Sequence, residues 1–252
     1  MKRAIVGVAV FGLAMLGWVG EGRADTVTLD AVADTTLIST STQYNYGWDN
    51  KIEVQNQWQY RTTLIKFDLP GDFVGGTVNS ATLKLDVYDT YFTGPASVNV
   101  YRSLVPWVEG PASQTWDAPA NWLIYDYGQS WNTDGALGAG SDFDNSEVAS
   151  ANYNKGFTGV MSFDVAGLVD DWASGAATNY GFELLAAPGD GVILSSGGVI
   201  VRCHSREGEA GGYGNGPELV LDYTAVPEPG TLLLIGTGLL GVWGYRRRRR
   251  MT

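Results

Sequence analysis

The sequence predicts an all-β fold for residues 25–225, an antiparallel β-sandwich of jelly-roll type. Two observations lead to this prediction. Short runs of aliphatic, β-branched and aromatic residues recur between clusters of Gly, Asn, Asp and Pro, which is typical of strands joined by turns. Almost none of the domain shows the 3.6-residue apolar period of a helix. Many short strands with little helix are typical of sandwiches. Residues 1–24 and 226–252 differ in composition and flank this domain.

The clearest strand is expected over residues 80–88. Leu83, Leu85 and Val87 alternate there with polar residues and Tyr88, which is the period of a half-buried strand. A second alternating run covers residues 64–69. Further strands are expected at 27–30, 51–55, 97–102, 160–165, 181–186, 198–205 and 218–223.

One helix and one long irregular segment complete the domain. Residues 165–173 show a helical pattern that Gly175 ends. Residues 103–159 are rich in Trp, Tyr, Asn, Asp and Gly and alternate poorly. Irregular segments of this length in a compact domain are usually functional or disordered, and the aromatic content favours order.

The N-terminus has the features of a cleavable signal peptide. Lys2 and Arg3 precede an apolar run over residues 4–19, and Gly22 and Ala24 place small residues where a signal peptidase reads them. Cleavage is expected after Ala24. The alternative is a first transmembrane helix. The polar sequence that follows the small residues favours the signal peptide over this alternative.

The C-terminus carries a short apolar segment followed by positive charge. Residues 231–245 are expected to form an apolar helix of 15 residues that includes four glycines. A bilayer core requires about 20 helical residues, so this length is poor for a permanent anchor. Positive residues stay cytoplasmic and bind anionic lipid, which orients the domain outward. These residues are Arg246, Arg247, Arg248, Arg249 and Arg250.

Pro227, Glu228 and Pro229, the apolar segment and the arginine cluster together resemble the PEP-CTERM sorting signal of Gram-negative bacteria that make exopolysaccharide. The resemblance implies that a membrane protease of the exosortase class recognises the three residues and removes the tail. The protein would associate with the inner membrane transiently, with a cytoplasmic C-terminus, and then reach the cell surface or extracellular matrix. An ordinary tail anchor is the alternative.

The charge of the predicted mature domain excludes one class of partner. Residues 25–225 hold eight Lys or Arg and 25 Asp or Glu residues, a net charge of −17. Nucleic acid is therefore not expected as a partner, because phosphate binding requires basic surfaces. The single cysteine, Cys203, allows no disulfide within the chain and is expected to be buried.

A series of short motifs follows the domain from end to end. They are Asp34 and residues 45–47, 63–69, 80–85, 98–101, 107–109, 163–165, 179–182, 205–207 and 217–219. Their order and spacing resemble the DNRLRE family of exported modules. The resemblance implies carbohydrate binding, since related modules often belong to larger polysaccharide-active proteins.

Aromatic residues of the irregular segment are the candidates for glycan contacts. Aromatic faces suit the apolar faces of sugar rings, and neighbouring polar groups suit the hydroxyls. Core packing is the equal alternative for the tryptophans among them. The candidates are Trp116, Trp122, Trp131, Tyr125 and Tyr127.

Asp142, Asp144 and Glu147 are the candidates for a metal site. Calcium prefers oxygen ligands, and these carboxylates are closely spaced. The spacing does not fit an EF-hand, so a solvated acidic loop is the alternative. A structural Ca²⁺ ion is a hypothesis, and no other cofactor is expected.

Catalysis is not expected. Cys203 and His204 are neighbours in a predicted strand and so point to opposite faces, which is a poor geometry for a Cys-His pair. No nucleophile-elbow motif is present. The sequence therefore predicts an exported, non-catalytic surface or matrix module that binds extracellular polysaccharide. The alternatives are a self-assembling structural protein and, less favoured, a glycosidase or polysaccharide lyase.

Overall fold

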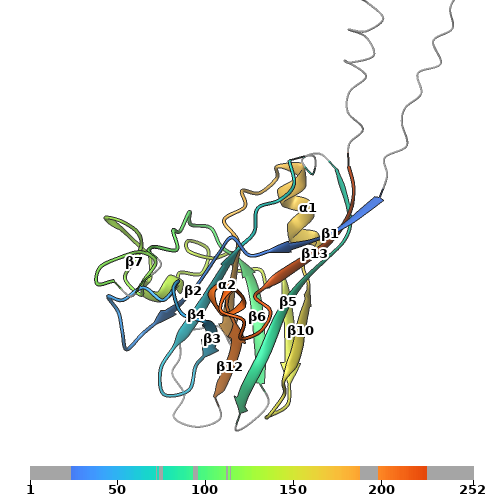
Figure 1. Cartoon of the computed structure of the whole chain (residues 1–252). Helices are drawn as coiled ribbons and strands as arrows, with labels where there is room; N and C mark the ends of the chain where they lie inside the picture. The colour runs from blue at the N-terminus through green and yellow to red at the C-terminus, as the bar shows by residue number, and fades with distance from the viewer. Residues whose placement is uncertain are drawn as a thin grey trace, which may run out of the picture. The chain divides into compact units, whose positions relative to one another are not determined.

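Antiparallel strands are the main secondary structure of the described residues in the computed structural model (Figure 1). The structure describes residues 24–225 except 72, 74, 75, 93–95, 112, 114 and 188–197. The signal peptide, apart from Ala24, and the whole sorting signal lie outside the described residues. Within those residues, none of the helices has the length and apolar character needed to cross a membrane.

The first layer of the fold is built on the long strand β5. The first half of β5 pairs with β13, which pairs in turn with β1. The second half of β5 pairs with β12, which continues to β3, and β10 lies along the opposite edge of β5. These strands are β1 (Ala24–Asp30), β3 (Lys51–Gln55), β5 (Thr77–Phe92), β10 (Gly159–Asp164), β12 (Val199–His204) and β13 (Glu218–Thr224).

The second layer is built on β4, which lies between β2 and β11. β11 continues to β6 and then to β9. A single pair, Gln55 with Arg61, joins β3 to β4, so the two layers form one curled sheet consistent with the predicted sandwich. These strands are β2 (Ala33–Ile38), β4 (Arg61–Lys66), β6 (Ala96–Arg102), β9 (Ala149–Tyr153) and β11 (Phe182–Ala186).

The sandwich core lies between the two layers. Leu83, Leu85 and Val201 enter it from the first layer, and Ile65 and Leu184 enter it from the second. The helix α1 (Ala166–Ser174) contributes Val169 and Trp172 to the same core, which accounts for its predicted apolar face. Cys203 also lies in this core as a free thiol, and burial raises its pKa.

A second cluster, the loop core, covers the other face of the second layer. Leu64, Tyr101 and Leu185 point into it. The residue next to each of them in its strand points the other way, into the sandwich core. The irregular segment folds over this face; in Figure 1 its strand β7 (Ile124–Asp126) lies at the left, on the far side from β10. The loop core consists of Leu37, Tyr60, Leu64, Tyr101, Val105, Trp107, Ala120, Trp122, Trp131, Ala136, Phe143 and Leu185.

Most predicted elements are confirmed, and the differences have a physical reason. The β4 strand begins and ends three residues earlier than predicted, and β2 and the short helix α2 (Arg206–Ala210) were not predicted. All of β2 except its first residue is buried, because both of its faces are covered, so no polar–apolar alternation marks it. The irregular segment contains β7, β8 (Gln129–Ser130), a 3-10 turn (Asp134–Ala136) and β9.

Candidate functional site

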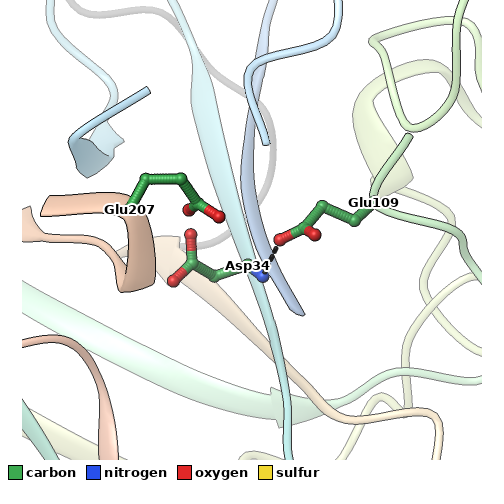
Figure 2. Close-up of side chains that lie close together, drawn as sticks. All are labelled: Asp34, Glu109 and Glu207. Carbon is green, nitrogen blue, oxygen red and sulfur yellow. Dashed lines mark hydrogen bonds between the residues drawn. The ribbon is translucent and has the colours of Figure 1, made fainter. Parts of the chain in front are cut away.

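Three carboxylates from distant parts of the chain meet beside β2. Asp34 belongs to β2, Glu109 to the irregular segment and Glu207 to α2, and Figure 2 shows their side chains converging. One oxygen of each lies within 4.8 Å of the others, a geometry that could hold a metal ion. Ser205 caps α2 by accepting a hydrogen bond from the Gly208 amide at 2.9 Å, which fixes the start of this helix.

Arg206 already binds this acidic cluster. Its guanidinium Nη2 lies 2.7 Å from Glu109 Oε2 and 2.5 Å from Glu207 Oε1. Its backbone amide donates to Asp34 Oδ2 at 2.7 Å, and the Asp34 amide donates to Glu109 Oε1 at 2.7 Å. The cluster therefore ties together three segments that are far apart in the sequence.

Burial favours the protonated forms of these carboxyls. The pKa of Asp34 is raised well above its usual value by burial and by the charges of Glu207 and Glu109. Burial raises the pKa of Glu109 to about 6 and also raises that of Glu207. Asp34 is only 1% exposed, so it cannot contact a polysaccharide. The cluster is therefore better suited to linking chain segments inside the fold than to contacting a polysaccharide at the surface.

The predicted calcium residues do not form a common cluster. Asp142 is buried, and its two oxygens accept hydrogen bonds from the amides of Asn132, Thr133 and Gly138 at 2.8–3.0 Å. Asp144 pairs with Arg102 at 2.6 Å. Glu147 is exposed. Within the described residues, the three acidic side chains that could hold an ion together are those of the Asp34 cluster. A structural calcium ion stays a prediction.

The predicted aromatic residues divide into exposed and buried sets. Trp116 and Tyr127 are 56% and 65% exposed, whereas Trp122 and Trp131 lie in the loop core. Tyr125 is half-buried and packs on Trp131, with 5.5 Å between ring centres. Trp122 and Trp131 therefore present no open ring face to a ligand. For these two tryptophans, the structure agrees with the core-packing alternative.

A ladder of charged residues crosses the outer face of β5, β12, β3 and β4. Arg202 of β12 pairs with Glu53 of β3 at 2.6 Å and with Asp89 of β5 on its other side. Glu53 is 3% exposed and also pairs with Arg61 and, at 3.8 Å, with Lys51. We call these five residues the charged ladder. It places many hydrogen-bonding groups on an otherwise acidic domain.

Aromatic rings lie at one end of the charged ladder. Tyr88, His204, Tyr213 and Asn50 line a cavity of about 300 Å³. Tyr213 is 66% exposed, and the rings of Tyr88 and His204 lie 4.8 Å apart. A side chain at Gly214 would collide with the His204 ring at 2.1 Å, so glycine allows this segment to lie against β12.

A second aromatic pair lies at the other end. Trp58 is 63% exposed and stacks on Tyr91, with 6.3 Å between ring centres and 29° between planes. Lys155 Nζ lies 4.6 Å from the centre of the Tyr91 ring. Trp58 has a φ of 64°, a left-handed conformation that is rare for a bulky residue. Such a conformation persists only where its surroundings enforce it.

Partial signals for these residues are present in the sequence. Strand alternation places Tyr88 on the polar face of residues 80–88, and it places Arg202 and His204 away from the sandwich core. The pairing of β12 with β5 and β3 brings them together, and nothing local in the sequence indicates that pairing.

Comparison with known families identifies two parts of the chain. Residues 25–122 match carbohydrate-binding module family 96, a match that includes Asp34, Trp58, Tyr88, Tyr91 and Glu109. Residues 225–250 match the PEP-CTERM protein-sorting motif, which covers Pro227–Pro229 and the arginine cluster. The chain therefore carries a domain similar to a carbohydrate-binding module and a PEP-CTERM sorting motif. A search of curated proteins finds no match. The resemblance to the DNRLRE family stays a prediction.

Proposed function

We propose that this protein is an exported, non-catalytic module that binds extracellular polysaccharide after sorting by an exosortase-type protease. The match of residues 25–122 to a carbohydrate-binding module family carries the proposal. The exposed aromatic rings of Trp58 and Tyr213 support it, since sugar rings stack on such faces. The DNRLRE resemblance is consistent with the same function.

Retention by polysaccharide tests the binding half of the proposal. The exported protein is expected to migrate more slowly in native gels that contain a polysaccharide ligand than in gels without one. A panel of neutral and acidic polysaccharides covers both ligand classes, and an albumin of similar net charge controls for sieving. Unchanged migration in every gel of the panel would contradict polysaccharide binding and favour the self-assembling alternative.

The same family description supports a non-catalytic role. The polysaccharide-cleaving alternative predicts new reducing ends or an unsaturated product when the protein is incubated with a bound polysaccharide. The buried position of Asp34 and the Arg206 contacts of Glu109 argue against the acidic cluster as a hydrolytic pair, because both glycosidase carboxyls must reach the glycosidic bond.

Processing of the C-terminus tests the proposal that an exosortase-type protease sorts the protein. We expect the exported protein to end close to Pro227-Glu228-Pro229 and to lack the arginine cluster, as mass spectrometry of surface material can show. In the sequence, only Ala225 and Val226 separate the end of β13 from Pro227. A Glu228→Ala variant is the control and is expected to keep its tail. An intact Arg250 in exported wild-type protein would contradict the proposal.

A further inference from the structure

We infer that the polysaccharide lies along the outer face of β5, β12 and β3, held at both ends by aromatic rings. The inference rests on the proposed function and adds to it the place of binding and the form of the ligand. The ligand is a glycan chain of several sugars, bound along its length. The glycan face consists of Trp58, Tyr91, the charged ladder, Tyr88, His204 and Tyr213.

The Trp58 end shows two features that packing does not explain. Trp58 is 63% exposed and so buries little of its surface, yet its backbone adopts the unfavourable left-handed conformation. Tyr91 stacks against the Trp58 ring with 29° between the ring planes, and Trp58 still keeps most of its surface open to solvent. An exposed indole ring supported in this way suits the apolar face of a sugar ring.

The Tyr213 end is a hollow rather than a flat surface. Tyr88, His204, Asn50 and the largely exposed Tyr213 line the cavity of about 300 Å³. The Tyr213 amide donates to the Gly208 carbonyl at 2.9 Å, which ties this wall to α2. Aromatic walls with an amide and an imidazole provide both stacking and hydrogen bonds to hydroxyls.

The strand register sets the distance between the two ends. Tyr91 pairs with Ile200 on β12, and His204 lies four residues further along that strand. At about 3.3 Å per residue, the two ends lie about 13 Å apart. A single sugar cannot contact both ends. A chain of several sugars can, and it would cross the charged ladder between them.

The charged ladder supplies polar contacts along this path. Four of the eight Lys and Arg residues of the domain lie on or beside the glycan face: Lys51, Arg61, Lys155 and Arg202. Arg61 and Arg202 share the carboxylate of Glu53, so their guanidinium groups are held in place before a ligand arrives. Preorganised groups lose less entropy on binding.

Variants at the two ends, with matched controls, test the inference by affinity electrophoresis of the exported protein. Trp58→Ala and Tyr213→Ala are each expected to weaken polysaccharide binding about tenfold, since each removes one aromatic contact. Trp116→Ala and Tyr127→Ala remove equally exposed rings elsewhere and are expected to bind like the wild type. Trp58→Gly is a folding control, because glycine adopts the left-handed conformation without strain and should bind as weakly as Trp58→Ala with a higher Tm.

The outcomes separate this inference from the proposed function. Wild-type binding that persists in Trp58→Ala and Tyr213→Ala would overturn the glycan face and leave polysaccharide binding intact. Loss of binding in Trp116→Ala and Tyr127→Ala alone would place the ligand on the irregular segment and also overturn it. Competition by a monosaccharide as effective as that by the long chain would contradict binding along several sugars. Absence of wild-type binding to the whole panel would defeat the proposed function itself.

Discussion

Replacement of Trp131 by alanine is expected to lower the free energy of unfolding by about 3–5 kcal/mol, the usual cost of truncating a buried aromatic side chain. Trp131 is 4% exposed, packs in the loop core and donates from its indole nitrogen to the Asn121 carbonyl at 2.8 Å. The variant would leave both a cavity and an unpaired carbonyl. Urea denaturation followed by circular dichroism measures the change.

Trp116→Ala is the matched control for this prediction. Trp116 lies in the same irregular segment, but it is 56% exposed and forms a T-shaped pair with Tyr44, with 4.9 Å between ring centres. Its loss is expected to cost about 1 kcal/mol or less. Trp131→Phe keeps most of the volume and provides a folded variant if Trp131→Ala does not fold. Equal stability of Trp131→Ala and the wild type would contradict the assignment of Trp131 to a core.

Replacement of Glu183 by glutamine is expected to stabilise the protein at neutral pH. Glu183 lies in β11 between Leu64 and Tyr101 and is fully buried, and its two carboxyl oxygens have no hydrogen-bond partner within the described residues. Its pKa is raised well above the usual value, first by burial and then by the charge of Asp142. Burial therefore favours the neutral form of this carboxyl in the folded protein.

The sign of the pH dependence follows from proton binding. Below the unfolded-state pKa of about 4.3, both states bind the proton and Glu183 has no effect on the pH dependence. Above it, the unfolded state releases the proton while the folded state retains it, so wild-type stability falls by about 1.4 kcal/mol per pH unit. The fall ends when pH exceeds the raised pKa of the folded state. Glutamine cannot ionise and avoids this loss.

Urea denaturation of both proteins between pH 4 and pH 8 tests this prediction. The stability difference in favour of Glu183→Gln should widen as pH rises. The titrations of Asp34, Glu109 and Glu207 cancel in this difference because they are present in both proteins. Glu147→Gln is the control, since Glu147 is exposed, and it should show no such trend. A pH-independent difference between the wild type and Glu183→Gln would contradict the prediction.

The strands that the sequence predicted best are those with one buried face. Residues 80–88 alternate cleanly because β5 faces the sandwich core on one side only, and most of that strand was found. β2 and β11 are buried on both faces, so their sequences show no alternation. β11 was still predicted from its aliphatic run, whereas polar residues such as Asp34, Thr35 and Thr36 concealed β2.

The candidate site was less predictable than the fold. Side chains of the irregular segment could face either solvent or a core, and composition alone does not distinguish these environments. The structure places Trp122 and Trp131 in the loop core and leaves Trp116 and Tyr127 exposed. Asp142 was a candidate ligand because of its neighbours in sequence, but its oxygens accept hydrogen bonds from three backbone amides.

The features that depend on local order can be recognised from the sequence alone: strand period, net charge, the single cysteine, and the sorting motif with its Pro-Glu-Pro residues. Each is a property of one continuous segment, so local physical chemistry is sufficient to recognise it. Which side chains meet depends on the tertiary structure. Asp34, Glu109 and Glu207 are far apart in the sequence and meet in the folded chain, and strand pairing places Trp58 and Tyr213 at the two ends of the glycan face. The register of that pairing depends on the burial of the whole sheet.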